Sequence, residues 1–286
     1  MKILILGAKG LLGHDLMAVF KNYRPIGYDI ENINLIQRNK IFEEISRLKP
    51  DLVLNAAGYT DVDCAEKELN MAKLINGIAV DYLAEICSKL NIILVHFSTD
   101  YVFSGRQKTG YLEKYFDHQP VNAYGRSKLL GEVAIKKWAN KGLKYYLVRS
   151  AWLFGPFSHS HQHKNFVDTI LRLAKEKDEI KVVNDQFGCP TYSLDLAKAV
   201  ERLIIEKHPF GIYHLINDGF ASWCDFAKKI VQIAEEKTKI IPCSSKEYPR
   251  PAKRPKYSIL LNTKCFKLRK WEEALKDYLK IKNTIL

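Results

Sequence analysis

Short aliphatic runs alternate with longer amphipathic segments along the first 150 residues of this 286-residue chain. Strands that alternate with helices in this way form parallel sheets with helices on both faces. The pattern therefore predicts an α/β fold, a Rossmann doubly wound parallel sheet. The strands are expected at residues 2–6, 25–28, 51–55, 92–98 and 145–149, and the helices at 11–22, 38–48, 67–90 and 122–141.

The pattern is less regular after residue 150, which indicates a second, smaller α/β domain. We expect a first domain over residues 1–150 and a C-terminal domain over 151–286. A segment near 185–206 has a helical pattern that suits a return to the first domain. Helices are expected at 166–175, 194–206, 223–236 and 271–280.

A glycine-rich loop, GAKGLLG, follows the first predicted strand and opens the first predicted helix. Residues without a Cβ permit a tight turn and close approach of a pyrophosphate, which the N–H groups and dipole of the helix N-terminus then attract. The loop predicts a dinucleotide site, although a plain strand-to-helix turn has the same pattern. Its contacts are assigned to Gly7, Gly10, Leu11, Leu12 and Gly13.

Asp29 closes the second predicted strand, where a carboxylate can accept hydrogen bonds from the adenosine ribose. The same carboxylate repels the 2′-phosphate of NADPH, and Lys9 in the glycine loop partly offsets that repulsion. The coenzyme is therefore predicted to be NADH or NADPH, with NADH slightly favoured.

Tyr124 and Lys128 lie four residues apart in a predicted helix and so share one of its faces. An ammonium beside a phenol lowers the phenol pKa, and the tuned hydroxyl can supply a proton to a ketone that receives a hydride. Ser98 and Thr99 end the preceding strand, at the edge where such sheets bind ligands. We predict that Thr99, Tyr124 and Lys128 are catalytic, that Thr99 and Tyr124 contact substrate, and that Ser98 lies beside the coenzyme. A solvated helix pair is the alternative explanation of the Tyr–Lys spacing.

The net charge of +13 favours an anionic partner. Residues 248–271 contain no acidic side chain and could contact a diphosphate. They lack the interleaved aromatic and basic residues that are typical of nucleic-acid-binding modules, so nucleic acid is not the expected partner. The six cysteines are scattered and form no C-x-x-C pair, and the start of the chain does not resemble a secretory signal. The sequence also contains no long apolar run. These features predict a cytoplasmic protein that is not associated with a membrane. The basic residues of 248–271 are Arg250, Lys253, Arg254, Lys256, Lys264, Lys267, Arg269 and Lys270.

Seven ordered motifs resemble those of the extended short-chain dehydrogenase/reductases along nearly the whole chain. They are GAKGLLG, NAAGYTDVDCAE at 55–66, STDYVFSG at 98–105, YGRSK at 124–128, RSAWLFGP at 149–156, DQFGCPTY at 185–192 and RPKYSIL at 254–260. The resemblance is to the branch that reduces the 4-keto group of dTDP-4-dehydro-L-rhamnose to dTDP-L-rhamnose with NAD(P)H. It implies that residues 1–150 bind the coenzyme and that 151–286 bind a nucleotide-diphosphate sugar.

The resemblance also implies roles for individual residues. Ala56, Ala57 and Tyr59 would line the coenzyme, Asn76 would lie in the helix beneath the site, and Trp152, Gln186, Thr191 and Arg254 would contact the substrate. Some members use a divalent cation at a dimer contact, so a homodimer is possible. No acidic pair is assignable to such a cation here, and no residue is assigned to a metal. His159, His161 and His163 alternate in a polar tract that could bind a transition metal, but a plain polar loop is the favoured explanation, because no cysteine or second ligand group lies nearby in the sequence.

Two alternatives to this function stay open at the level of sequence. The fold and catalytic set also suit a reductase of another nucleotide-linked 4-keto-sugar. A non-catalytic regulatory subunit resembling the β subunit of methionine adenosyltransferase would retain the coenzyme loop as well. The intact Thr99, Tyr124 and Lys128 favour an enzyme.

Overall fold

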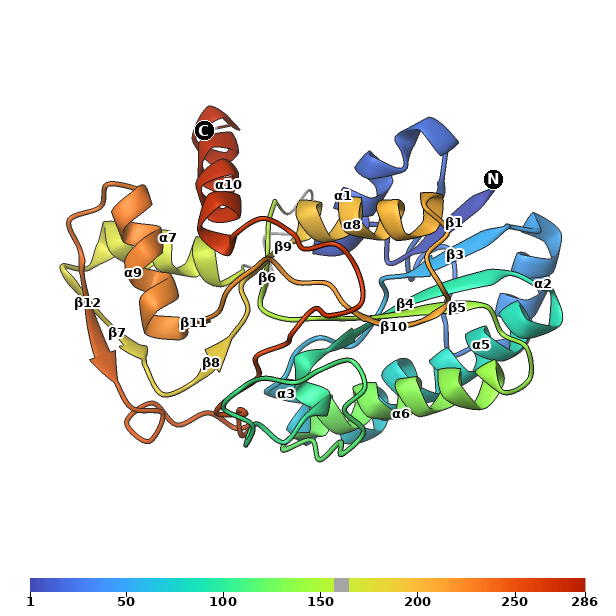
Figure 1. The fold of residues 1–286 in the computed structure, drawn as a ribbon, viewed down its shortest axis with the longest axis horizontal. Coiled ribbons are helices and arrows are strands. Elements are labelled where there is room, and N and C mark those ends of the chain that lie inside the picture. Colours follow the sequence, from blue (N-terminus) through green and yellow to red (C-terminus); the bar gives the residue numbers. More distant parts are fainter. Residues whose placement is uncertain (157–164, 286) are drawn as a thin grey trace.

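A six-stranded parallel sheet forms the centre of the computed structural model, which describes residues 1–156 and 165–285 (Figure 1). The strand order is β10-β5-β4-β3-β1-β2, and every neighbouring pair is parallel. The predicted doubly wound α/β fold is confirmed. The strands are β1 (Ile3–Leu6), β2 (Ile26–Tyr28), β3 (Leu52–Asn55), β4 (Ile93–Thr99), β5 (Tyr145–Ser150) and β10 (Gly211–His214).

The chain reverses its direction of winding beside β1, because β2 pairs with one edge of β1 and β3 with the other. Such a reversal leaves a crevice at the carboxyl ends of the strands, where open α/β sheets bind ligands. The glycine loop follows β1 at that point. The register also sets the end of β4 beside the end of β5, with Thr99 paired to Ser150.

Helices cover both faces of this sheet (Figure 1). On one face α1 (Leu11–Val19) packs against α8 (Ser193–Ile205), and their aliphatic side chains meet those of β1, β3 and β5 in one core. On the other face α2 (Arg38–Leu48), α5 (Ala79–Lys89) and α6 (Ala123–Ala139) enclose a second core. The strands are buried on both faces, which explains their nearly continuous apolar runs.

The helix expected over 67–90 is interrupted. The structure has α3 (Cys64–Lys67), α4 (Leu69–Lys73), a π-helical turn at Leu74–Ile78 and then α5. Within the turn, the Asn76 amide donates to the carbonyl of Tyr59 and to Ser127 Oγ, both at 2.9 Å. π-Bulges occur often at functional sites, and this one joins the loop after β3 to α6.

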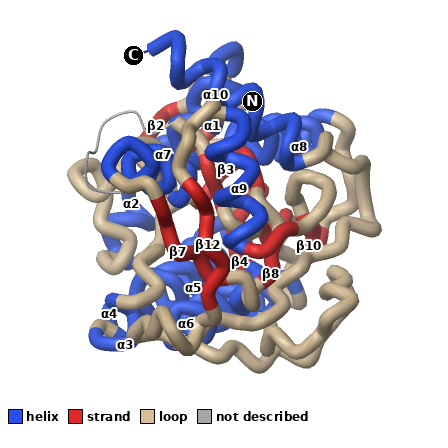
Figure 2. The backbone as a smooth tube through the Cα atoms, turned by 90° about the vertical axis from the view of Figure 1, so that its left-hand side faces the viewer, coloured by secondary structure: helices blue, strands red, loops and turns tan. Residues whose placement is uncertain are grey.

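The second layer is built from short elements (Figure 2), and it has an apolar core of its own. β7 (Glu179–Val183) pairs in parallel with β12 (Lys239–Cys243), and α7 (Phe166–Glu176), α9 (Trp223–Ile233) and α10 (Trp271–Ile285) pack against them. α9 begins with a capping box in which Ser222 and Asp225 exchange hydrogen bonds. The remaining elements are β6 (Leu153–Phe154), β8 (Phe187–Gly188), β9 (Thr191–Tyr192), β11 (Ala221–Ser222) and the 3₁₀ turns Lys21–Tyr23 and Asp100–Val102.

Two segments from the second half of the chain lie in the first layer. α8 contacts α1, and β10 pairs with β5 at the edge of the central sheet. The four-residue run at β10 is too short to be recognised by periodicity in the sequence. Within the described ranges, none of the helices is both long and apolar enough to span a membrane. The tract containing His159, His161 and His163 lies outside the described residues.

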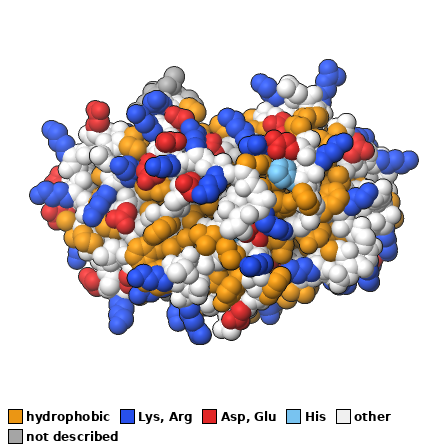
Figure 3. All heavy atoms as spheres, viewed as in Figure 1, with side chains coloured by type: hydrophobic (Ala, Val, Ile, Leu, Met, Phe, Trp, Pro, Cys, Tyr) orange, Lys and Arg blue, Asp and Glu red, His pale blue; other side chains and the backbone are white. Residues whose placement is uncertain are grey.

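Lysine and arginine side chains are spread over the face shown in Figure 3, with carboxylates between them. Several form short ion pairs on exposed helices, among them Arg172–Glu176 at 2.8 Å and Arg202–Glu206 at 2.7 Å. On these helix faces, carboxylates on the same helix therefore balance part of the positive charge.

Candidate active site

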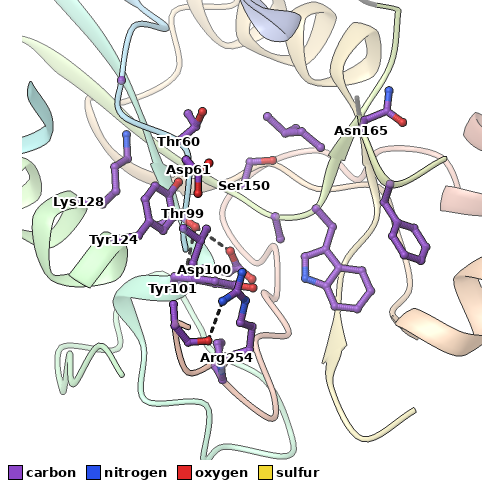
Figure 4. Close-up of a pocket in the computed structure, with 18 of the residues that line it drawn as sticks. Thr60, Asp61, Thr99, Asp100, Tyr101, Tyr124, Lys128, Ser150, Asn165 and Arg254 are labelled. Atoms are coloured by element: carbon purple, nitrogen blue, oxygen red, sulfur yellow. Dashed lines mark hydrogen bonds between the residues drawn. The ribbon is translucent and has the colours of Figure 1, made fainter. Parts of the chain in front are cut away.

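A cleft of about 2000 Å³ opens at the carboxyl ends of β1, β3 and β4. One wall contains the glycine loop, the segment after β3, the end of β4 and the first turns of α6. The opposite wall comes from the chain after β5, from α7 and from residues 248–257. Figure 4 shows Thr99, Tyr124 and Lys128 together on one wall and Asn165 on the other. The cleft occupies the place where a doubly wound sheet binds its ligand.

The glycine loop has the geometry of a dinucleotide cradle. Gly7 has φ +75°, and a Cβ there would lie 2.7 Å from the Ala57 nitrogen. A Cβ on Gly13 would lie 1.9 Å from the Gly7 oxygen. Gly7, Gly10, Leu11 and Leu12 line the cleft, whereas Gly13 does not. Gly13 lets the first turn of α1 pack closely on the loop, and its contact with a coenzyme stays a prediction.

The far end of the cradle is acidic. Asp29 lines the cleft and accepts the backbone N–H of Lys9 at 3.0 Å. The Lys9 ammonium does not face Asp29 but bonds Glu31 Oε1 at 2.8 Å. The cation that was expected to offset repulsion of a 2′-phosphate is therefore already paired with a second carboxylate.

The loop after β3 is held by its backbone. Ala56 and Ala57 line the cleft as the resemblance implies. Tyr59 does not: its hydroxyl donates to Glu68 at 2.8 Å, and its N–H donates to Asn76 Oδ1 at 2.9 Å. Tyr59 thus anchors the loop through its main chain, while Glu68 holds its hydroxyl.

Tyr124 and Thr99 meet at the strand end, because α6 begins beside it. Asn122 caps α6 by accepting the N–H of Gly125, and Tyr124 follows in the first turn. Tyr124 and Thr99 both line the cleft, and the Tyr124 ring meets that of Tyr101 edge to face with centroids 5.9 Å apart. The phenol therefore points into the cleft at the end of β4, where the predicted chemistry requires it.

The predicted effect of Lys128 on the pKa of Tyr124 is wrong for this arrangement. Burial raises the pKa of Tyr124, and the nearby Thr99 hydroxyl opposes the rise only partly. The Lys128 ammonium donates instead to the Phe97 carbonyl at 2.6 Å. Burial also lowers the pKa of Lys128 to about 8, against the attraction of Glu132. In this desolvated site the cost of burying charge exceeds the help from the neighbouring cation, so Tyr124 is protonated at neutral pH.

The Thr99 hydroxyl has two partners from its own strand end. It donates to Asp100 Oδ1 at 2.8 Å and accepts the N–H of Tyr101 at 3.2 Å. A hydroxyl has one proton and two lone pairs, so these two contacts leave one acceptor position of the Thr99 oxygen. That Thr99 contacts substrate stays a prediction.

A buried ion pair lies directly behind these residues. Arg149 on β5 donates to Glu132 on α6 at 2.9 Å from Nε and 2.6 Å from Nη2, and both side chains are 0% exposed. Ser98 was expected beside the coenzyme; it lines the cleft, but its hydroxyl donates to Glu132 at 2.6 Å. Glu132 lies one turn beyond Lys128, so the pair joins the catalytic helix to two central strands.

The predicted substrate residues divide into two groups. Trp152 and Gln186 line the cleft, and the Trp152 ring stacks on Trp223 with centroids 3.5 Å apart. Thr191 does not line the cleft, because it is fully buried and its hydroxyl donates to the Cys189 carbonyl at 3.1 Å. The prediction that Thr191 contacts substrate is therefore not supported; its N–H instead holds the carbonyl of Trp152.

Arg254 lines the cleft but is already engaged. Its guanidinium forms a two-pronged ion pair with Asp63, which also accepts the N–H of Ala252. The contact fastens residues 248–257 to the loop after β3 and so closes one end of the cleft. Arg250 lies 3.8 Å from Asp63 and is more exposed. Lys253 and Lys256 line the same rim, so the cleft has further cations that can face a diphosphate.

A comparison with known families accords with this geometry: the model described as the RmlD substrate binding domain matches residues 1–283. The chain belongs to this family. The resemblance drawn from the ordered motifs is thereby confirmed. Within the RmlD substrate binding domain family, the chain is 38% identical over 284 residues to the spore coat polysaccharide biosynthesis protein SpsK of Bacillus subtilis, covering 97% of this chain and 96% of that protein.

Two further members are dTDP-4-dehydrorhamnose reductases. The one from Burkholderia thailandensis is 38% identical over 281 residues, covering 92% of this chain and 91% of the relative. The one from Bacillus anthracis has a crystal structure in complex with NADP. It matches with a TM-score of 0.91 and 36% identity, covering 98% of this chain and all of that one.

Several cleft residues were not anticipated from the sequence. Asp100 directly follows Thr99, and its position beside a predicted catalytic residue was the available signal. Asn165, Trp223 and Asp61 also line the cleft, but no sequence pattern distinguishes them from capping, core or turn residues. In the ranges that the structure describes, no group of three or more His, Cys, Asp or Glu side chains is placed to hold a metal ion.

Proposed function

We propose that this chain reduces the 4-keto group of dTDP-4-dehydro-L-rhamnose to dTDP-L-rhamnose with NADH or NADPH. The observation that carries the proposal is the meeting of Tyr124 and Thr99 at the end of β4, in the same cleft as the glycine loop. Membership of the RmlD substrate binding domain family and similarity to named dTDP-4-dehydrorhamnose reductases support it.

When bound, the coenzyme supplies a hydride to the ketone carbon. The carbonyl oxygen then gains negative charge and needs a proton, which the Tyr124 hydroxyl donates. A raised pKa suits this direction of reaction, because an acid must hold its proton until the substrate oxygen becomes basic. The Lys128 ammonium is buried beside the same strand end, where it donates to the Phe97 carbonyl. In this account Tyr124 is the catalytic acid, and Lys128 provides positive potential at the site.

The glycine loop suits the coenzyme, because Gly7 and Gly10 line the cleft at the start of α1. A Cβ at either position would crowd the loop backbone, so the tight turn requires glycine there. We place the pyrophosphate at the N-terminus of α1 and the adenosine ribose at Asp29. The pairing of Lys9 with Glu31 makes the ribose end acidic and supports a preference for NADH. The complex of the Bacillus anthracis relative with NADP supports use of the phosphorylated coenzyme as well.

We assign the opposite wall to the nucleotide sugar, with Trp152 beside the hexose and Gln186 and Arg254 toward the diphosphate. Arginine suits that anion because its planar fork donates paired hydrogen bonds to phosphate oxygens. The first layer, including α8 and β10, would hold the coenzyme, and the second layer would hold the substrate. We expect the reaction to take place in the cytoplasm.

The decisive experiment measures coenzyme oxidation with enzymatically prepared dTDP-4-dehydro-L-rhamnose, using NADH and NADPH separately. Tyr124→Phe is the matched control, because it removes the acidic proton and keeps the ring. Turnover by the wild type and its loss in the control support the proposal. Another nucleotide-linked 4-keto-hexose is tested in parallel, because SpsK is as similar to this chain as the named reductases are. Faster reduction of that sugar would overturn the substrate assignment, and turnover by Tyr124→Phe would overturn the assignment of the acid.

A further inference from the structure

We propose that Asp63 is a positioning residue for the nucleotide sugar. It holds the basic strap, residues 248–257, in the place where the cations of the strap can face a diphosphate in the cleft. The inference rests on the proposed reductase function and adds a residue that belongs neither to the catalytic set nor to the assigned substrate contacts. Every residue of the basic strap lines the cleft, whereas Asp63 does not. Asp63 therefore acts on the substrate through the strap.

The basic strap does not fix its own position. Residues 248–256 are all described, and they form neither helix nor strand. Pro249, Pro251 and Pro255 stiffen the segment and lack the N–H with which it could pair. A stiff segment without regular hydrogen bonds takes its place from its contacts with the rest of the chain. Those contacts consequently decide where its four cations lie.

Asp63 holds the middle of the strap through both backbone and side chain. Its carboxylate accepts the Ala252 N–H at 3.1 Å and forms a two-pronged ion pair with Arg254, in which Nη2 lies 2.9 Å from Oδ2. Arg254 Nη1 donates in addition to the Ala252 carbonyl at 2.6 Å. Both polar groups of Ala252 are thus bound within one set of contacts, and the residue is 1% exposed. The carboxylate therefore fixes the strap and the direction of its arginine together.

The later part of the strap has supports of its own. Asn122, which caps α6, donates from Nδ2 to the Lys253 carbonyl at 2.8 Å. The Tyr257 N–H donates to the Gly105 carbonyl at 3.0 Å. Gly105 also permits close approach, because a Cβ there would lie 2.4 Å from Pro255 Cβ. These supports begin at Lys253, so the carboxylate described above provides the polar contacts of the strap before that point.

The cost of placing a carboxylate here indicates what it does. A negative charge behind the cations of the cleft repels an anionic substrate, so its presence weakens binding unless it also orders the groups that bind. Arg254 has five N–H bonds, and its contacts with Asp63 and Ala252 use three of them. Donors therefore remain for phosphate oxygens on a guanidinium that is already oriented. Binding groups held by a second set of contacts lose less freedom when the ligand arrives. The strap cations that line the cleft are Arg250, Lys253, Arg254 and Lys256.

The direction of the change in affinity separates positioning from charge. Asp63→Asn removes one negative charge beside the site of an anion, and by Coulomb attraction alone this change tightens binding of a diphosphate. Positioning predicts the opposite, because an amide has one acceptor oxygen and cannot form the two-pronged pair with Arg254. The strap then loses its fixed place, and binding weakens.

The test uses the full chain and two measurements. Isothermal titration calorimetry gives the dissociation constant of dTDP without any turnover, and coenzyme oxidation gives kcat and the KM for dTDP-4-dehydro-L-rhamnose. For Asp63→Asn we expect the dTDP dissociation constant and the KM to rise about five- to twentyfold, with kcat and the NADH dissociation constant within about twofold of wild type. Asp63→Glu keeps the carboxylate and is expected to stay within about threefold of wild type. Arg254→Lys keeps the charge but loses the fork, so it is expected to weaken dTDP binding and decides the matter if Asp63→Asn does not fold.

Asp61→Asn is the matched control, because it removes the same charge from the same loop. The Asp61 carboxylate accepts the Cys64 N–H at 2.8 Å instead of a group of the strap, so its loss is expected to leave dTDP binding equal or slightly tighter. Unchanged or tighter dTDP binding by Asp63→Asn, or by Arg254→Lys in its place, would overturn the inference. An equal weakening in Asp61→Asn, or an equal rise in the NADH dissociation constant, would overturn it in favour of general support of the loop. If the wild type bound dTDP but reduced no dTDP-4-dehydro-L-rhamnose, the proposed function would fail, and the titrations would still decide the role of Asp63.

Discussion

The buried Arg149–Glu132 pair allows a quantitative prediction, because both partners are fully enclosed and their contacts are known. Replacing Glu132 with Gln removes the charge that compensates the guanidinium and retains an amide oxygen for one of its hydrogen bonds. What is left of the environment of Arg149 is the imidazole nitrogens of His118 and His214, at 2.8 and 3.4 Å, and the Glu113 carbonyl at 3.5 Å. None of these groups carries the full negative charge that a buried cation needs.

Breaking a buried ion pair in this way costs about 3–5 kcal/mol of unfolding free energy, because an uncompensated charge remains in the interior. We expect about 3 kcal/mol for Glu132→Gln, because the amide keeps one acceptor, and about 3–5 kcal/mol for Arg149→Met, which leaves the carboxylate with the Ser98 hydroxyl and with His118 Nε2 at 3.9 Å. The double variant buries no charge. Its cost should therefore be smaller than the sum of the single costs by about 3 kcal/mol.

Urea unfolding followed by circular dichroism measures the four free energies of this cycle. Ser98→Ala, which removes a neutral hydroxyl from the same carboxylate, is the control and should cost about 1–2 kcal/mol. Additive single effects, or single costs below about 1 kcal/mol, would refute the reasoning, since either result means that the pair contributes no more than a solvated one. A large coupling would show that the pair fastens α6 to β4 and β5.

Four further measurements test the site. Tyr124→Phe should lower turnover by about 10²–10⁴-fold with an NADH dissociation constant within about twofold of wild type, and Lys128→Ala should weaken both, as kinetics and coenzyme fluorescence titration will show. Turnover should fall above about pH 8 as Lys128 loses its proton, because burial lowers its pKa to about 8 and the ammonium is present only below that value; a profile flat to pH 9–10 would contradict this. Glu31→Gln should release Lys9 toward a 2′-phosphate and improve the KM for NADPH relative to NADH by about two- to fivefold, whereas an unchanged ratio would mean that the pairing has no effect on coenzyme choice. Gly13→Ala should raise the NADH dissociation constant by about tenfold or more, because the new Cβ would lie 1.9 Å from a loop oxygen, and unaltered binding would show that the loop can yield.

Periodicity and local chemistry were sufficient for the first five strands of the central sheet and for α2. The observed β1, β2, β3, β4 and β5 lie within a residue or so of the predicted strands, and α2 has the predicted bounds. The reason is that these strands are buried on both faces and their helices on one, so the apolar pattern of each segment records its environment directly. Tyr124 and Lys128 lie on one helix, and the glycines lie in one loop after β1. Their spacing could therefore be recognised from local sequence alone.

The remaining features depended on contacts between distant segments, which no local pattern records. β10 joins the sheet through pairing with β5, Arg254 is turned toward Asp63 across 191 positions of the chain, and Thr191 is buried by its surroundings. The pKa of Tyr124 is the clearest case. A neighbouring lysine in the sequence suggested a lower value, whereas the packing of the first turn of α6 against β4 raises it. The sequence determined which ionisable groups are present, and tertiary structure decided their proton affinities, because these depend on desolvation and on partners that folding brings together.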